Sequence, residues 1–79
     1  MRINVLSFGI VKDIFNCPKI QLEFEGTTAG ELRERLENKY PKLRQLASYM
    51  ISVNNEYATD DTIIKQEDEI AIIPPVSGG

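Results

Sequence analysis

Polar and apolar residues alternate along the first part of the chain. Over residues 2–8, Ile3 and Val5 fall on one side of an extended backbone, which is the period of a half-buried strand. The alternation stops at Gly9, and the apolar positions that follow recur at helical spacing. This change of period predicts a short helix that ends before Pro18.

The second strand has the clearest pattern in the sequence. Over residues 19–25, Ile20, Leu22 and Phe24 point one way, and polar or charged residues point the other. We expect this strand to pair with the first strand as a hairpin.

The main helix is predicted by a capping motif followed by an apolar face. Thr28 and Glu31 have the spacing of a capping box, and Leu32 and Leu36 lie on one helical side. Pro41 should end this helix, because proline has no backbone N–H for the helical hydrogen bond.

The second half of the chain predicts short elements. Residues 43–50 favour a short helix or turn, and residues 50–53 favour a strand. Asn54 and Asn55 can take the positive φ angles of a tight hairpin turn. The return of the chain along that hairpin is followed by a final Ile-rich strand at residues 69–73.

This order of elements predicts an α+β domain over residues 1–73. It would contain a mixed sheet of four to five strands with the main helix packed across one face. The last strand should run through the centre of the sheet, parallel to the first, because its Ile-rich sequence suits burial on both faces. Residues 74–79 would form an extended, flexible tail.

Composition and charge exclude several classes of function. The chain has 79 residues, enough for one core, and its net charge is −3 with no basic run, so we do not expect a nucleic-acid partner. No apolar stretch reaches the roughly 20 residues that span a bilayer, and we expect a cytoplasmic protein. Histidine is absent, which excludes histidine-dependent nucleophilic and zinc chemistry within this chain.

The candidate reactive group is the terminal carboxylate of Gly79. Pro74 and Pro75 cannot donate hydrogen bonds to a sheet, so the chain should leave the last strand stiffly. Gly78 and Gly79 have no side chains and could enter a narrow channel. The single thiol, Cys17, has no histidine to activate it, and we do not expect catalysis there.

The terminal residues resemble those of a known family. Residues 73–79, with the sequence Ile-Pro-Pro-Val-Ser-Gly-Gly, resemble the end of the molybdopterin synthase small subunits, which are sulfur carriers of the ubiquitin-like β-grasp fold. The resemblance covers the whole chain, including the helix capped by Thr28 and the hairpin at Asn54. The family often has arginine where Lys12 stands and glycine where Glu67 stands, which puts in doubt an anion contact carried over to Lys12.

The resemblance implies a sulfur-transfer function that depends on two partners. An ATP-dependent activating enzyme, using Mg²⁺, would adenylate Gly79 and then convert it to a thiocarboxylate. The large catalytic subunit of molybdopterin synthase, in a heterotetramer, would receive the tail and pass its sulfur to cyclic pyranopterin monophosphate. This chain would bind no cofactor or metal itself. The tail residues inserted into the partner would be Pro74, Pro75, Val76, Ser77 and Gly78.

The partner contacts expected beside the tail are apolar and acidic. The candidates are Phe8, Ile72, Pro75 and Val76, with Glu67 and Asp68 at the rim.

Three alternatives stay open at the level of sequence. A thiamine-pathway sulfur carrier would share the fold and the activation, although the Pro-Pro spacer argues against it. A ubiquitin-like modifier would join Gly79 to lysines of other proteins, but the basic residues that often precede the glycines of such tails are absent here. A simple interaction module would never have its tail activated.

Overall fold

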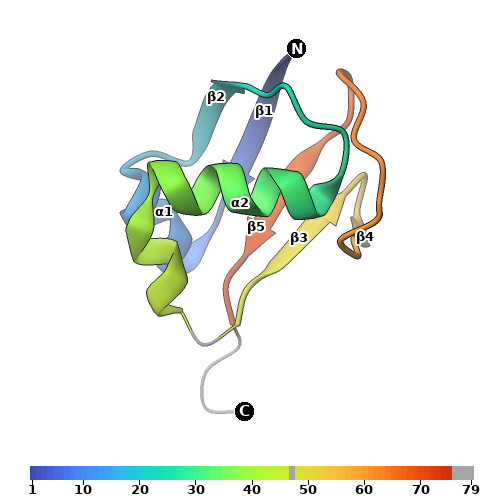
Figure 1. Cartoon of the computed structure of the whole chain (residues 1–79). Coiled ribbons are helices and arrows are strands. Elements are labelled where there is room, and N and C mark those ends of the chain that lie inside the picture. Colours follow the sequence, from blue (N-terminus) through green and yellow to red (C-terminus); the bar gives the residue numbers. More distant parts are fainter. Residues whose placement is uncertain (47, 76–79) are drawn as a thin grey trace.

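Five strands form one mixed sheet in the computed structural model, which describes residues 1–46 and 48–75. Helix α2 lies across one face of this sheet (Figure 1). The elements in chain order are β1 (Arg2–Ser7), α1 (Gly9–Phe15), β2 (Lys19–Glu23), α2 (Ala29–Lys39), the 3₁₀ helix η1 (Pro41–Gln45), β3 (Met50–Val53), β4 (Glu56–Tyr57) and β5 (Ile70–Ile73). The spatial order of the strands is β2-β1-β5-β3-β4.

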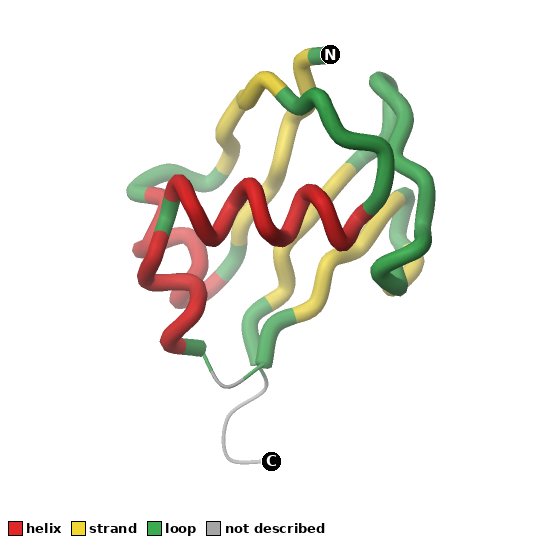
Figure 2. Tube along the Cα trace, in the orientation of Figure 1, coloured by secondary structure: helices red, strands yellow, loops and turns green. Residues whose placement is uncertain are grey.

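Strand β5 occupies the centre of the sheet, as the sequence predicted. It runs parallel to β1 and antiparallel to β3, and the tube view shows the three strands side by side beneath α2 (Figure 2). The antiparallel pairing of β1 with β2 is also confirmed, with α1 in the connection between them. The predicted α+β mixed sheet with a helix across one face is therefore correct.

The core lies between the sheet and its helices. The predicted inner faces of the first two strands are confirmed, because the following apolar residues belong to one buried cluster: Ile3, Val5, Ile20 and Leu22. The second strand ends at Glu23, two residues before its predicted end, and Phe24 directly after it belongs to the same cluster. The same cluster contains Leu32 and Leu36 of α2. Removal of this apolar surface from water is the main stabilising contribution for a domain of this size.

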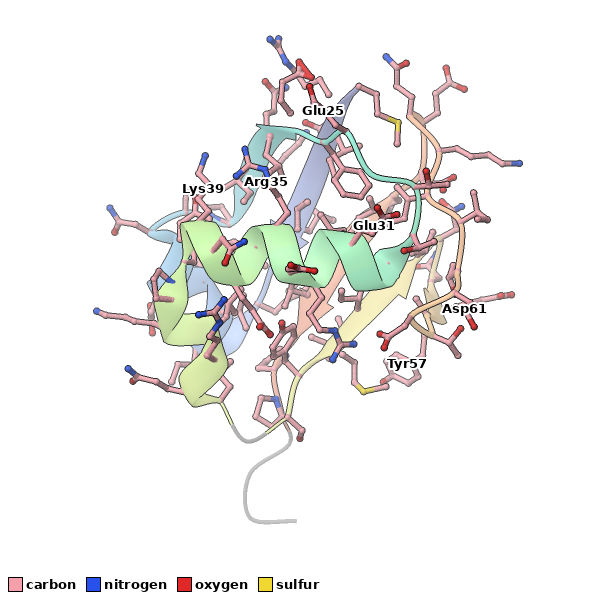
Figure 3. All side chains as sticks on the ribbon, viewed as in Figure 1. Glu25, Glu31, Arg35, Lys39, Tyr57 and Asp61 are labelled. Atoms are coloured by element: carbon pink, nitrogen blue, oxygen red, sulfur yellow. The ribbon has the colours of Figure 1, made fainter. Side chains whose placement is uncertain are left out.

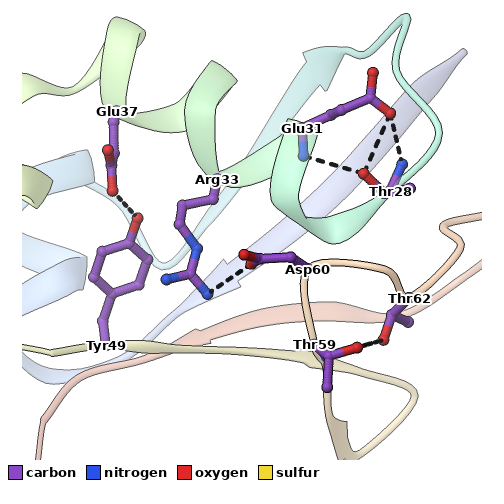
Figure 4. Close-up of polar contacts among 8 residues, drawn as sticks. All are labelled: Thr28, Glu31, Arg33, Glu37, Tyr49, Thr59, Asp60 and Thr62. Atoms are coloured by element: carbon purple, nitrogen blue, oxygen red, sulfur yellow. Dashed lines mark hydrogen bonds and ion pairs between the residues drawn. The ribbon is translucent and has the colours of Figure 1, made fainter.

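The start of α2 is held by the predicted capping box and by a distant loop. The Thr28 hydroxyl accepts from the Glu31 N–H at 3.3 Å, and the Glu31 carboxylate accepts from the Thr28 N–H at 3.1 Å (Figure 4). The Gly30 N–H donates to the Asp60 carbonyl at 3.0 Å. Two free N–H groups at the helix start thus find partners, and the hydrogen bonds to its carboxylate lower the pKa of Glu31.

The end of α2 differs from the prediction in one respect. The helix stops before Pro41, as expected, but the next helical turn begins at Pro41 itself rather than at residue 43. Proline is favoured in the first turn of a helix, because its missing N–H would have no helical partner there. The predicted short helix at 43–50 was therefore wrong in both bounds, since Met50 belongs to β3.

A polar contact ties the chain beyond η1 back to α2. The hydroxyl of Tyr49 donates to a carboxylate oxygen of Glu37 at 2.5 Å (Figure 4). Burial and this acidic neighbour raise the pKa of Tyr49 well above its ordinary value. The guanidinium of Arg33 lies 5.3 Å from the centre of the Tyr49 ring. This contact positions the chain that leads into β3.

No helix within the described part of the chain is long and apolar enough to cross a membrane.

Candidate functional site

The chain leaves the sheet at the end of β5. Ile73 is the last strand residue, and Pro74 and Pro75 follow it in a half-buried position. The strand ends there because proline cannot donate to the ladder. The predicted functional residues Val76, Ser77, Gly78 and Gly79 lie outside the described residues, so their roles stay predictions.

The first residue of the tail lies on the backbone of Gly9. A Cβ atom added to Gly9 would come within 3.1 Å of Cγ of Pro74, and Gly9 has a φ of +54°. Both the close approach and the positive φ favour glycine. The junction between β1 and α1 therefore lies beside the point where the tail leaves the sheet.

Phe8 precedes this glycine and is exposed. Its side chain is 48% exposed, and its carbonyl accepts from the N–H of Val11 at 3.1 Å in the first turn of α1. Its backbone is extended, with φ −137° and ψ 156°, so it continues the alternation of β1. The structure thus places Phe8 at the surface next to the tail, and its contact with a partner stays a prediction.

The sheet surface opposite α2 adds apolar residues that the sequence analysis missed. Met50 pairs with Ile73 at the end of β5, and Tyr57 pairs with Ser52. Met50 is 42% and Tyr57 69% exposed, and Tyr57 projects from the β3–β4 edge (Figure 3). We call the surface formed by Phe8, Met50, Tyr57 and Ile73 the open face. These outward-facing residues could have been found from the two-residue period of the strands together with the pairing of the strands. The pairing was not known from the sequence.

Ile72 is not part of the open face, which corrects one prediction. Its side chain is 0% exposed, and it pairs with Ser7 on one side and Ile51 on the other. Successive strand residues point to opposite faces, so Ile72 faces the core and the half-exposed Ile73 faces outward. The expected contact between Ile72 and a partner was therefore wrong.

The acidic pair also lies elsewhere. Glu67 and Asp68 precede β5, so about 20 Å of extended chain separates Asp68 from Pro74, at roughly 3.3 Å per residue. The pair therefore does not lie beside the point where the tail leaves the sheet, and its contact with a partner stays a prediction.

Asp68 has a structural role in its turn. Its carboxylate accepts from the N–H of Lys65 at 2.8 Å and from Nδ2 of Asn54 at 3.0 Å. These hydrogen bonds, the one from Lys65 first, lower the pKa of Asp68. Asn54 has the predicted positive φ, at +54°.

Cys17 shows no catalytic arrangement in the structure. Its half-buried Sγ lies 3.3 Å from the carbonyl oxygen of Lys19, and its own carbonyl accepts from the Ser7 hydroxyl at 2.8 Å. Across residues 1–46 and 48–75, no group of three or more histidine, cysteine or acidic side chains could hold a metal ion.

Comparison with known proteins gives consistent results over the whole chain. A family model described as the ThiS family matches residues 5–79. A molybdopterin synthase sulfur carrier subunit from Arabidopsis thaliana is 36% identical over 81 residues, which cover 100% of this chain and 84% of that protein. Its counterpart from Mycobacterium tuberculosis is 37% identical over 82 residues, covering 100% and 99%.

A solved structure agrees with these relatives. The complex of subunits 1 and 2 of the molybdopterin-converting factor from Helicobacter pylori contains a chain that matches this one with a TM-score of 0.70 and 28% identity. The match covers 100% of both chains. The fold is the ubiquitin-like β-grasp.

Proposed function

We propose that this chain, which belongs to the ThiS family, is the sulfur carrier subunit of a molybdopterin synthase. The observation that carries the proposal is the position of the Gly-Gly terminus: it follows a Pro-Pro spacer directly after the central strand. Relatives with this function match the chain from end to end. The thiamine-pathway and modifier alternatives are not favoured.

The carboxylate of Gly79 must be activated before it can carry sulfur. It is ionised at neutral pH and is a poor electrophile. An activating enzyme supplies ATP with Mg²⁺: a carboxylate oxygen attacks the α-phosphorus, pyrophosphate leaves, and an acyl adenylate forms. A persulfide sulfur of the donor then displaces AMP and forms an acyl disulfide. A second thiol attacks the donor's sulfur in this sulfur–sulfur bond, so the thiocarboxylate leaves and the two thiols end as a disulfide. This use of ATP fits a cytoplasmic protein.

The large subunit then receives the thiocarboxylate. The thiocarboxylate sulfur attacks a carbon of cyclic pyranopterin monophosphate, and an oxygen substituent of that carbon leaves. Hydrolysis of the resulting thioester returns Gly79 as the carboxylate and leaves the sulfur on the substrate. The groups that bind this substrate and move its protons belong to the large subunit, in keeping with a chain that contains no histidine.

The described residues supply the docking geometry for this reaction. Strand β5 is paired on both sides, so the start of the tail has a fixed position. The open face places exposed Phe8 and Met50 next to that point. Exposed aromatic and methionine side chains are typical of the centre of a protein interface, so we assign the open face to contact with the large subunit.

Intact-mass measurement after reconstitution tests the proposed function. The chain is incubated with ATP, Mg²⁺, its activating enzyme and a sulfur donor, and the expected product carries sulfur in place of oxygen at Gly79. The matched control carries one alanine appended after Gly79 and should stay unmodified and inactive, because its carboxylate is displaced by one residue. A carrier that never acquires sulfur under these conditions would show that the proposal is wrong.

A further inference from the structure

Pro74 starts the tail, and the hydrogen bonds of the sheet do not set the position of its ring. The last pair between β5 and β3 joins Ile73 to Met50. The last pair between β5 and β1 joins Ile72 to Ser7, one residue earlier along β5. Proline has no N–H for a further ladder bond, and its own φ is fixed at about −65°. The ring must therefore take its position from packing beyond the end of the strand.

The backbone of Gly9 is the surface on which this ring packs. Cγ of Pro74 lies 3.1 Å from the point where a Cβ atom of residue 9 would stand, and Cβ of Pro74 lies 3.9 Å from that point. Two carbon atoms attract each other best at about 3.5–4.0 Å, so the ring occupies space that a side chain at position 9 would need. We call this contact between Pro74 and the backbone of Gly9 the glycine seat.

The glycine seat is held in place by the core. Gly9 begins α1, which packs against both β1 and β5, and Val11 and Phe15 of this helix are buried. The carbonyl of Phe8 accepts from the N–H of Val11 at 3.1 Å. The positive φ of Gly9, +54°, turns the chain from β1 into the helix. A seat that is fixed on three sides can direct the chain that leaves across it.

A small displacement at the seat becomes larger along the tail. A Cβ atom at position 9 would push Cγ of Pro74 outward by about 0.3 Å, from 3.1 Å to the 3.4 Å at which ordinary contact begins. Over the roughly 3.3 Å length of one extended residue, this shift tilts the chain by about a tenth of a radian. Six extended residues reach roughly 20 Å, so the same tilt moves their end by about 2 Å. A misplacement of about 1 Å is enough to slow a reaction severely.

We propose that Gly9 is a positioning residue for sulfur transfer, because the glycine seat aims the tail so that the thiocarboxylate of Gly79 meets the substrate in a reactive position. This inference rests on the proposed sulfur-carrier function. Gly9 acts through the absence of a side chain, and its effect reaches the reacting group through Pro74. A purely structural role, in which Gly9 serves only the turn between β1 and α1, predicts a loss of stability without a loss of transfer rate.

A double-mutant cycle separates the seat from the turn. Gly9→Ala adds a Cβ atom that meets the proline ring, and it also strains the positive φ. Pro74→Ala removes Cγ, so that the nearest atom left on residue 74 is its Cβ, at an ordinary contact distance of 3.9 Å. The strain in φ is the same in both backgrounds and cancels in the cycle, whereas the contact with the ring is present in only one of them.

The measurement is the single-turnover rate of sulfur transfer to cyclic pyranopterin monophosphate with the large subunit at saturation. Each variant is made as the thiocarboxylate from an intein fusion, in which hydrosulfide displaces the intein thiol at the carbonyl carbon of Gly79, so the activating enzyme is not needed. We expect Gly9→Ala to lower this rate about threefold to thirtyfold, with a much smaller change in the Kd for the large subunit. With Pro74→Ala already present, the same change at residue 9 should alter the rate less than about twofold.

Gly30→Ala is the matched control. A Cβ atom at residue 30 would also come within 3.1 Å of a neighbouring side chain, at Cβ of Asp60, but this contact lies at the start of α2 and does not involve the tail. The transfer rate of the control at saturation should equal that of the wild type. Urea unfolding of each variant measures any loss of stability separately.

Three outcomes would overturn the inference: an unchanged rate for Gly9→Ala, an equal loss with and without Pro74→Ala, or the same loss for Gly30→Ala. A wild-type thiocarboxylate that transfers no sulfur to the substrate would instead overturn the proposed function, so the two failures are distinguishable.

Discussion

The two ends of strand β5 are built from opposite kinds of interaction. At its start, Asn54 donates from its amide to Asp68 at 3.0 Å and accepts from the N–H of Glu69 at 2.9 Å. At its end, Pro74 and Pro75 have no N–H to donate, and an apolar ring lies on the backbone of Gly9. The hydrogen-bonded end anchors the strand and the proline end releases the chain from the sheet, so one strand serves both as scaffold and as the base of the tail.

The largest expected effect is on the free energy of unfolding, when two neighbouring isoleucines on opposite faces of β5 are changed in turn. Ile72→Ala should lower the free energy of unfolding by about 2–5 kcal/mol, because it leaves a cavity in the core. Ile73→Ala, on the half-exposed open face, should lower it by less than about 1 kcal/mol. Urea unfolding measures both, and equal losses would contradict the assignment of the two faces.

The hydrogen bonds at the start of β5 can be removed by changing Asn54. Asn54→Ala should lower the free energy of unfolding by about 1–3 kcal/mol, since it removes two hydrogen bonds and strains a positive φ. Asn55→Ala is the matched control, because Asn55 also has a positive φ, at +69°, but has no role in the contact with Asp68. A cost that is the same for both variants would mean that only the backbone angle matters.

Binding to the large subunit through the apolar end of β5 can be weakened without unfolding the domain. Phe8→Ala should raise the Kd for the large subunit about fivefold to thirtyfold, equivalent to roughly 1–2 kcal/mol, while the free energy of unfolding changes little. Glu34→Ala is the control, because Glu34 is exposed on α2, which covers the side of the sheet opposite the open face. Isothermal titration calorimetry should detect no change for this control.

The smallest expected effect is the pH dependence of the anchored end. The pKa of Asp68 in the folded protein lies below its ordinary value of 3.8. Its contribution to stability is therefore complete above that ordinary value and is lost as the pH falls through the folded pKa. The difference in unfolding free energy between the wild type and Asp68→Asn should shrink between about pH 5 and pH 2. A difference that stays constant would show that the ionised carboxylate contributes nothing.

Local sequence was sufficient wherever neighbouring residues determine the structure. The alternation of Ile20 and Leu22 identified the inner face of β2, and the spacing of Thr28 and Glu31 identified the start of α2. These signals depend on backbone period and on hydrogen bonds that span only a few residues. The stop of the central strand at Pro74 is of the same kind, because proline acts through its own missing donor.

Tertiary structure decided which of these residues reach the surface. The final strand is apolar at every position, so it had no alternation to tell Ile72 from Ile73, and only pairing with β1 and β3 assigned their faces. The contact between Gly9 and Pro74 joins segments about 65 residues apart, and the distance of Asp68 from the tail follows from the direction of β5. Such placements depend on long-range pairing, which no short window of sequence contains. The sequence alone therefore predicted the reactive terminus, whereas the faces on which the residues of β5 lie were decided by the fold.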